Sequence, residues 1–228
     1  MEGIFGNTMN LTNYIQKETK LQVIQEPSND KYTCFNTGGV ESEVGEFLYG
    51  LVRAIKPENI LETGTHKGIA SSYMALALKE NNKGHLDTIE FDPQHYEEDY
   101  HMWDSLTISN YITLHEMKSE NFVTDKVYDL VLLDTEPDIR FEEFIQFYNS
   151  VKPGGIIIIH DLHPHLGLSG LTAHGMEHFL FGDFRKYLGD FILKHEVQVI
   201  SLPTPRGITI FQKTAPDFSV TKHLKGEI

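Results

Sequence analysis

The sequence predicts an α/β fold: a doubly wound, mostly parallel sheet of seven strands that ends in an antiparallel hairpin and carries helices on both faces. Two observations lead to this prediction. From Asn59 onward, short apolar segments alternate with longer segments of helical character, which is typical of parallel sheets. Two of the apolar segments, 130–133 and 156–159, contain no polar residue, as expected for central strands covered on both faces.

The elements follow one another along the chain with short connections. Strands are expected at 59–63, 85–90, 111–115, 128–133, 155–160, 196–201 and 207–212. Helices are expected at 11–18, 69–80, 93–107, 138–151 and 174–191. The segment 202–207 between the last two strands is too short for a helical crossover, so these strands should pair as an antiparallel hairpin.

A further helix is expected before the first strand of the sheet. Its apolar residues recur at helical spacing and form one face, with Ser42 as the expected N-cap and Pro57 just beyond the end. These apolar residues are Val44, Phe47, Leu48, Leu51, Val52 and Ile55. We therefore divide the chain into an N-terminal cap or lid segment (1–40), an α/β domain (41–214) and a C-terminal tail (215–228).

Composition restricts the classes of function. The 228 residues suit one α/β domain, and no apolar run reaches the roughly 18 residues that a membrane helix needs. The first ten residues lack the features of a secretory signal, and the single cysteine, Cys34, leaves no intramolecular disulfide, so we expect a cytoplasmic protein. A formal net charge of −14 argues against nucleic acid as a partner.

The most informative motif is the turn that follows the first strand of the alternating region. This strand ends at Glu62, and the turn from Gly64 through Thr65 and His66 to Gly68 leads into a helix. Glycine has no Cβ, so the backbone can approach a ligand closely, and the free N–H groups of the following helix point toward it. The adenosine end of a cofactor can bind at such a turn.

The second and third strands end in residues that suit the rest of an adenosine. Glu90 lies 22 residues beyond Gly68, where an acid can accept hydrogen bonds from both ribose hydroxyls. Asp92 is expected to cap the next helix, with Pro93 in its first position. Ser119 can either touch the adenine edge or serve as an ordinary helix cap.

The fourth and fifth strands end in a cluster of carboxylates and imidazoles. Such a cluster can bind a divalent metal or supply a general base. The spacing matches no fixed metal motif, so a histidine-rich loop with one base and no metal is the alternative. The residues are Asp134, Glu136, His160, Asp161, His163 and His165.

Together these motifs resemble the class I S-adenosylmethionine-dependent methyltransferases. Within that class they are most similar to the small-molecule O-methyltransferases of the catechol and caffeoyl-CoA type and to related enzymes of bacterial secondary metabolism. The resemblance runs from about Gly38 to Lys213 and implies a Rossmann-like fold. The segments that carry it are 42–48, 61–68, 89–90, 133–134 and 160–161.

The resemblance implies an enzyme that uses S-adenosylmethionine to methylate a small-molecule hydroxyl, and it implies a homodimer. The helix at 174–191 and the N-terminal segment would form a lid over the substrate. Asp134 and Asp161 would hold a divalent cation such as Mg²⁺. The acceptor would face Asp134, His160, Asp161 and His163. The cofactor would contact Glu62, Gly64, Thr65, His66, Gly68, Glu90, Ser119 and Asp134.

Three positions depart from the pattern of this family. Leu162 stands where metal-dependent members carry Asn, and Pro137 stands where many carry a catalytic lysine. Ala70 replaces a serine that often follows the loop. Glu136 or one of the three histidines His160, His163 and His165 would therefore have to serve as the base.

Three alternatives to this function remain open. A nicotinamide-dependent oxidoreductase would need G-x-G-x-x-G after the first strand, but Glu62 holds the first glycine position. A non-catalytic protein of the same fold would bind a partner and would not convert a substrate. A metal-dependent hydrolase or hydroxylase would use the cluster of Asp134, Asp161 and histidines, and metal content after purification would reveal it.

Overall fold

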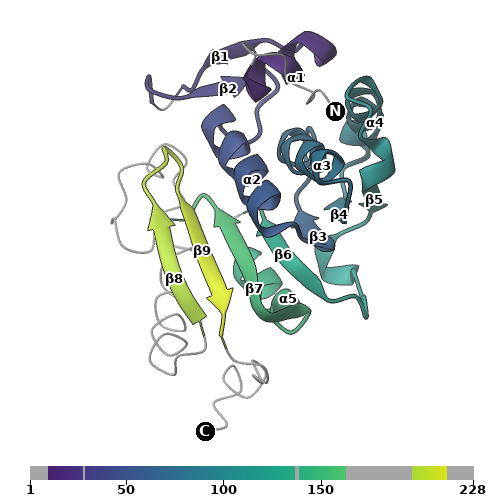
Figure 1. The fold of residues 1–228 in the computed structure, drawn as a ribbon, viewed down its shortest axis with the longest axis vertical. Coiled ribbons are helices and arrows are strands. Elements are labelled where there is room, and N and C mark those ends of the chain that lie inside the picture. Colours follow the sequence, from purple (N-terminus) through teal and green to yellow (C-terminus); the bar gives the residue numbers. More distant parts are fainter. Residues whose placement is uncertain (1–9, 28, 137–138, 163–196, 215–228) are drawn as a thin grey trace, which may run out of the picture. The chain divides into compact units, whose positions relative to one another are not determined.

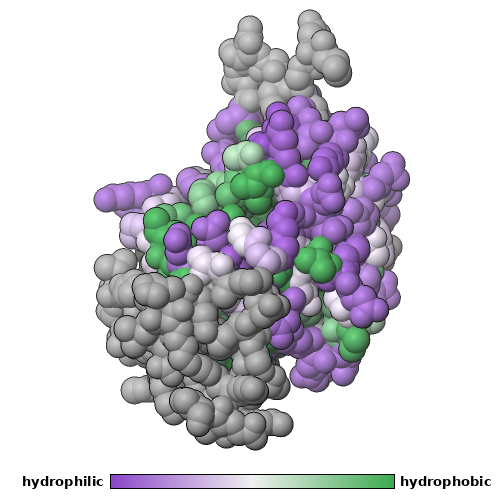
Figure 2. Space-filling view, turned by 60° about the horizontal axis from the view of Figure 1, so that its bottom comes forward, coloured by the Kyte–Doolittle hydropathy of each residue, from purple (hydrophilic) through white to green (hydrophobic). Residues whose placement is uncertain are grey.

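The computed structural model describes residues 10–27, 29–136, 139–162 and 197–214 (Figure 1). The chain divides into two compact units, Met1–Ser119 and Glu120–Ile228. Among the described residues, no helix is both long enough and apolar enough to cross a membrane. On the face shown in Figure 2 hydrophilic residues predominate and hydrophobic residues form separate areas, which suits the net charge of −14.

The first unit contains three parallel strands with β4 between β3 and β5. The strands β3 and β4 are mostly buried, and helices connect the parallel neighbours, as expected of parallel pairs. The strands are β3 (Asn59–Thr63), β4 (His85–Glu90) and β5 (Ile112–Glu116). The connecting elements are α3 (Ile69–Asn81), α4 (Pro93–Ser105) and the 3₁₀ helix η1 (Ser109–Tyr111). Asp92 caps α4 as predicted, accepting a hydrogen bond from the N–H of Gln94 at 3.0 Å.

Helix α2 (Ser42–Ile55) packs closely against α3, and the two lie side by side in Figure 1. A Cβ built on Gly45 would lie 2.3 Å from the ring of Tyr73, so only glycine fits at this crossing. The predicted N-cap was wrong by one residue. Glu41 holds the N-cap position without a side-chain hydrogen bond, and Ser42 is the buried first residue of the helix.

Alanine substitutions at two glycines of α2 should have opposite effects on stability. Gly45→Ala is expected to destabilise the protein by about 1–3 kcal/mol, because the added methyl group overpacks the contact with Tyr73. Gly50→Ala is expected to stabilise it by roughly 0.5–1 kcal/mol, because Gly50 lies in the helix interior with open space around it. Urea unfolding of both variants measures the difference, and equal effects would contradict the described helix packing.

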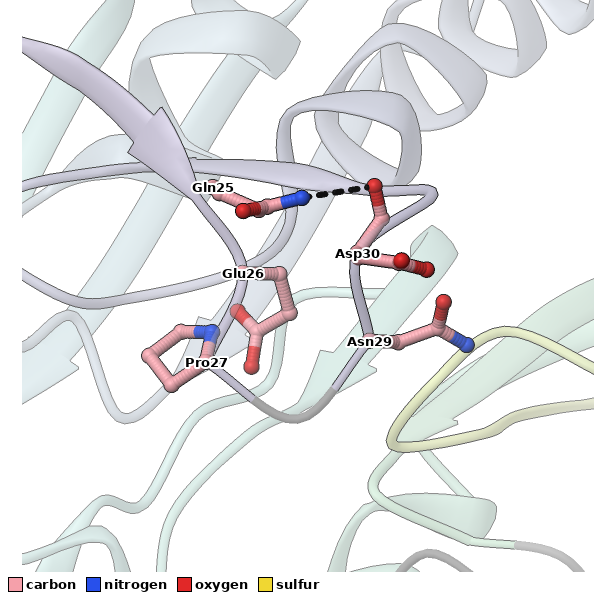
Figure 3. A pocket seen from close by; sticks show the side chains of 5 residues that line it. All are labelled: Gln25, Glu26, Pro27, Asn29 and Asp30. Atoms are coloured by element: carbon pink, nitrogen blue, oxygen red, sulfur yellow. Dashed lines mark hydrogen bonds between the residues drawn. The ribbon is translucent and has the colours of Figure 1, made fainter.

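The N-terminal segment contains structure that the sequence pattern did not reveal. Helix α1 (Leu11–Thr19) was predicted, whereas the short antiparallel pair β1 (Val23–Gln25) and β2 (Thr33–Phe35) was not. Three-residue strands give too little alternation to detect. The hollow in Figure 3 lies inside the turn between these strands, where the Gln25 side-chain amide donates to the Asp30 carbonyl at 2.9 Å. We interpret this hollow as part of the turn.

Helix α1 is held against the rest of the first unit by apolar and polar contacts. Ile15 is fully buried, and the Thr12 hydroxyl donates to the Glu46 carboxylate at 2.6 Å. The same hydroxyl lies 2.9 Å from that of Tyr73. Burial raises the pKa of Tyr73 well above its ordinary value, so this phenol stays protonated and can donate. These contacts fix α1 to α2 and α3.

In its described residues, the second unit contains the remaining four strands of the sheet and the helix α5. The order is β6-β7-β9-β8, in which β6 and β7 are parallel and the last two pairs are antiparallel. The core includes buried aromatic residues such as Phe144, Tyr148 and Phe211. The elements are β6 (Tyr128–Leu133), α5 (Arg140–Tyr148), β7 (Val151–His160), β8 (Val197–Leu202) and β9 (Ile208–Lys213).

The predicted fold class is confirmed: seven strands, mostly parallel, with a C-terminal antiparallel hairpin. The bounds of α5 and β7 differ most from the predicted ones. Helix α5 occupies 140–148 instead of 138–151, because β7 already begins at Val151 and not at 155. The expected helix at 174–191 lies outside the described residues.

Candidate functional site

The turn between β3 and α3 adopts the strained backbone that its glycines permit. Gly64 and Gly68 have φ angles of 79° and 63°, and His66 between them has 49°. The N–H of Gly64 donates to the carbonyl of Ile89 at 3.0 Å, and the N–H of Gly68 donates to that of Thr65 at 2.8 Å. The first bond fixes the turn to the end of β4 and the second closes the turn, so a ligand there would meet a preformed backbone surface.

Glu90, the predicted ribose acceptor, ends β4 with its carboxylate held by backbone groups. The N–H of His66 donates to Oε2 at 2.8 Å, while those of Phe91 and Asp92 donate to Oε1 at 2.8 and 2.9 Å. The residue is 8% exposed. Hydrogen bonds of this kind fix the orientation of the carboxylate. The structure thus brings together the turn and Glu90, as the sequence predicted.

Glu62 faces the interior of the first unit. Glu62 is fully buried. Its carboxylate accepts a hydrogen bond from the hydroxyl of Ser71 and another, at 2.6 Å, from the hydroxyl of Thr88. The hydroxyl of Thr88 also lies 2.6 Å from that of Thr65. This buried network ties the turn to α3 and β4. Direct contact of Glu62 and Thr65 with a cofactor stays a prediction, while their support of the turn is observed.

Exposed apolar side chains flank Glu90, and the sequence reasoning missed them. Phe91 is 59% exposed and Met117 is 38% exposed. The N–H of Met117 donates to the carbonyl of Glu90 at 2.9 Å, and the Lys118 ammonium lies 5.9 Å from the centre of the Phe91 ring. A large apolar residue directly after the strand-end acid was the available signal. Such surface near an acid suits a flat heterocycle joined to a sugar.

Ser119 is 5% exposed and begins the 3₁₀ helix η2 (Ser119–Asn121). Its role as a helix cap stays a prediction. Contact with adenine stays a prediction.

A cavity of about 350 Å³ lies beside the turn in the first unit. This volume is within the range of small-molecule pockets, roughly 300–1,000 Å³. Its walls come from the N-terminal segment, the turn and the second half of α4. The residues that line it are Thr19, Leu21, Thr37, Lys67, His101, Met102 and Ser105.

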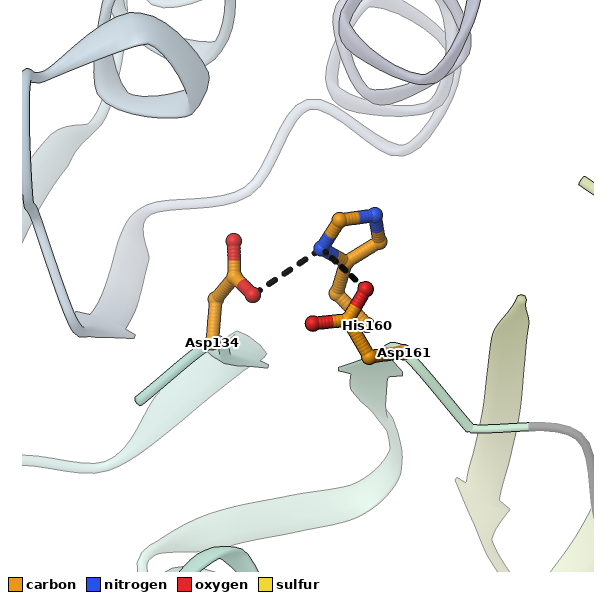
Figure 4. Close-up of side chains that lie close together, drawn as sticks. All are labelled: Asp134, His160 and Asp161. Atoms are coloured by element: carbon orange, nitrogen blue, oxygen red, sulfur yellow. Dashed lines mark hydrogen bonds and ion pairs between the residues drawn. The ribbon is translucent and has the colours of Figure 1, made fainter. Parts of the chain in front are cut away.

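In the second unit, three of the predicted acceptor residues form a compact cluster (Figure 4). Asp134 follows β6 directly, His160 ends β7, and Asp161 comes next. The Nδ1 atom of His160 lies 2.9 Å from Asp134 Oδ1 and 3.5 Å from Asp161 Oδ1. The imidazole is 1% exposed and each carboxylate side chain is 15% exposed. In Figure 4 the other ring nitrogen, Nε2, points away from both carboxylates.

Arg140, which the sequence reasoning did not select, completes this cluster. Its Nη2 lies 3.4 Å from Asp134 Oδ1 and 3.1 Å from Asp161 Oδ2. Its other nitrogens donate to the carbonyl of His160 and, at 2.7 Å, to that of Thr135. The side chain is 4% exposed. An arginine in the first turn of the helix after β6 was the only signal in the sequence.

Asp161 is held ionised by its surroundings. Burial raises its pKa, but the nearby charges of His160, Arg140 and Arg206 lower it more, to about 2. The Nε atom of Arg206 lies 3.6 Å from Asp161 Oδ1. A carboxylate with this pKa is too weak a base to remove a proton near neutral pH.

The remaining candidates of the cluster cannot be placed in it. His163 and His165 lie outside the described residues, as does Pro137. Glu136 is described, and it is exposed. The cofactor and metal assignments of the sequence reasoning therefore fall in two groups, one around Glu90 in the first unit and one around His160 in the second.

Comparison with known proteins finds similarity to methyltransferases. A family model described as "Methyltransferase domain" matches residues 61–162. A putative O-methyltransferase from Mycobacterium sp. (strain JLS) is 27% identical over 137 residues, which cover 58% of this chain and 61% of the relative. A catechol O-methyltransferase from Niastella koreensis is 27% identical over 125 residues, covering 52% of this chain and 56% of the relative. The chain thus matches less than two thirds of the length of either relative.

Solved structures agree on the fold. The O-methyltransferase TomG from Streptomyces achromogenes, solved in complex with SAM, has a TM-score of 0.65 at 18% identity. The match covers 91% of this chain and all of TomG (100%). The chain has the Rossmann-like fold of the class I S-adenosylmethionine-dependent methyltransferases, and its resemblance to their O-methyltransferases is confirmed.

Proposed function

We propose that this chain transfers a methyl group from S-adenosylmethionine to a hydroxyl group of a small molecule. The observation that carries the proposal is the turn of Gly64 to Gly68 bonded through the His66 N–H to the Glu90 carboxylate at 2.8 Å. This arrangement offers a bare backbone, a helix N-terminus and a fixed acid, which are the parts an adenosine needs. The similar proteins that are O-methyltransferases support the choice of acceptor atom.

The residues of the first unit fit the cofactor by their chemistry. Glu90 would accept hydrogen bonds from the ribose, Phe91 and Met117 would cover the adenine, and the turn would contact the rest. When bound, the cofactor supplies an electrophilic methyl group on a sulfonium. The protein then has to position the acceptor in line with that methyl group and remove its proton.

His160 is the best candidate for the base that removes this proton. Asp134 lies 2.9 Å from its Nδ1, an arrangement that orients an imidazole and leaves Nε2 as the basic atom. Asp161 has too low a pKa for this role. Because the imidazole is only 1% exposed, the proposal requires that the groups covering it move when an acceptor binds.

A phenol is the acceptor that this site can activate most easily. Its pKa lies near 10, so a single histidine suffices, whereas a sugar hydroxyl needs stronger assistance. The cavity beside Lys67 includes Thr19, Leu21 and Thr37, which supports a part for residues 1–40 in covering a ligand. A homodimer, implied by the resemblance, is a further part of this proposal, and light scattering of the purified protein tests it.

Two measurements test the proposed function. Calorimetry should show binding of S-adenosylmethionine and S-adenosylhomocysteine but not of NAD, and labelled methyl groups should pass to catechol or a related phenol. Binding of NAD without binding of S-adenosylmethionine or S-adenosylhomocysteine would refute the proposal in favour of an oxidoreductase. Cofactor binding without transfer to any of a broad set of phenols, sugars and amines would favour a non-catalytic protein of the same fold.

Replacing Glu90 by alanine should weaken binding of S-adenosylhomocysteine by about 1–3 kcal/mol, the usual cost of losing a charged hydrogen-bond partner. The loss has two sources, because the carboxylate would bind the ribose and also holds the N–H of His66. Isothermal titration calorimetry measures it. Glu58→Ala is the matched control, since Glu58 is exposed, pairs with Lys83 and precedes β3 at its other end. Unchanged affinity in the Glu90 variant would contradict the ribose role.

A further inference from the structure

The cluster around His160 has the residue types of a metal site but not its charge. Asp134, His160 and Asp161 each offer a ligand atom, and these atoms lie within 4.8 Å of one another. By spacing and chemistry this set could hold a divalent cation, which the resemblance to metal-dependent methyltransferases also implies. Whether it does depends on what else contacts the two carboxylates.

Arginine already neutralises both carboxylates. Arg140 lies 3.4 Å from Asp134 and 3.1 Å from Asp161, and Arg206 lies 3.6 Å from Asp161. Two guanidinium groups thus face two carboxylates, so a divalent cation would enter a site of no net negative charge and meet like charges at close range. Arginine cannot avoid this by losing its proton.

Arg140 is also held too firmly to be displaced easily. It donates to the carbonyls of Thr135 and His160 as well as to the carboxylates, and only 4% of its side chain is exposed. Leu162, at the position where metal-dependent relatives carry Asn, is a buried apolar residue that offers no side-chain oxygen to a metal. The residues present therefore do not fit a divalent cation.

We infer that the Arg140 guanidinium takes the place of a divalent cation in this chain, as the positive group that binds Asp134 and Asp161. It holds Asp134 and Asp161 in fixed positions beside Nδ1 of His160, and it excludes metal from the cluster. Arg140 is accordingly a positioning residue that acts through Asp134 on the imidazole. The consequence for the reaction, methyl transfer without metal, rests on the proposed function, whereas the exclusion of metal does not.

Titration with Mn²⁺, followed by the electron paramagnetic resonance signal of the free ion, tests this inference on chelator-treated full-length protein. The wild type is expected to leave the signal unchanged up to millimolar Mn²⁺. Arg140→Met should bind Mn²⁺ at least about tenfold more tightly, because Asp134 and Asp161 lose the guanidinium that they share. Arg53→Met, which removes an arginine bonded to Asn81, is the control and should bind none.

Three outcomes would overturn the inference. The first is micromolar binding of Mn²⁺ by the wild type that disappears in Asp161→Asn. The second is a folded Arg140→Met that gains no affinity for Mn²⁺. If Arg140→Met does not fold, Arg140→Lys is tested in its place. Arg140→Lys keeps the positive charge and should bind no Mn²⁺. Binding of Mn²⁺ by Arg140→Lys would be the third outcome that overturns the inference. Calorimetry with S-adenosylhomocysteine on the same samples reports separately on the proposed function.

Discussion

Replacing Gly64 by valine should abolish measurable binding of S-adenosylhomocysteine, a loss of roughly 100-fold or more, which corresponds to about 2.7 kcal/mol. Gly64 has a φ of 79°, which β-branched residues rarely adopt, and its N–H is bonded to Ile89 at 3.0 Å. The valine side chain would also project from the backbone surface that the cofactor is proposed to contact. Calorimetry of the purified variant measures the effect.

Gly154 provides a matched control for this variant. Its φ is also 79°, it lies in β7, and a Cβ built on it would have no neighbour within 4 Å. Gly154→Val should therefore carry a similar backbone strain of about 1–2 kcal/mol in stability while leaving cofactor affinity unchanged. Retained binding in Gly64→Val, or equal loss in both variants, would show that the turn is not the cofactor site.

Replacing His160 by glutamine should lower kcat by about 10²–10⁴-fold, the usual contribution of a positioned general base. Glutamine can still bond to Asp134, but it has no basic nitrogen. Affinity for S-adenosylhomocysteine should stay the same, so the effect should appear in kcat with any phenol that the wild type methylates. Steady-state kinetics with labelled cofactor measures it.

His85→Gln is the control for this prediction. His85 begins β4, and its Nε2 lies 2.8 Å from the hydroxyl of Thr113, so it is a histidine of the sheet bonded to a polar side chain. Its replacement should leave kcat unchanged. If kcat of His160→Gln stays within about twofold of the wild type, His160 is not the base, and His163 or His165 becomes the next candidate to replace.

The parts of this protein that the sequence alone determined are those fixed by local pattern. The bounds of β3, β4 and β6 match the predicted ones. In β6 the continuous apolar segment 130–133 leaves little choice of register or length. The cofactor turn was also predicted from local pattern, because glycines at 64 and 68 permit positive φ angles that other residues adopt only at a cost. Strand ends in a parallel sheet then placed Glu90, Asp134 and His160 at candidate sites.

Only the tertiary structure decided what these residues contact. Glu62 accepts hydrogen bonds from the buried hydroxyls of Ser71 and Thr88. Glycine is required at position 45 because the ring of Tyr73 packs against its backbone. Neither contact can be predicted from local sequence pattern. The same holds for Arg140, which comes from a helix to pair with Asp134 and Asp161 at the ends of two strands. Residue type and spacing predict which groups are near a strand end. Whether a buried carboxylate meets a metal or a guanidinium depends on side chains that come together only when the chain has packed.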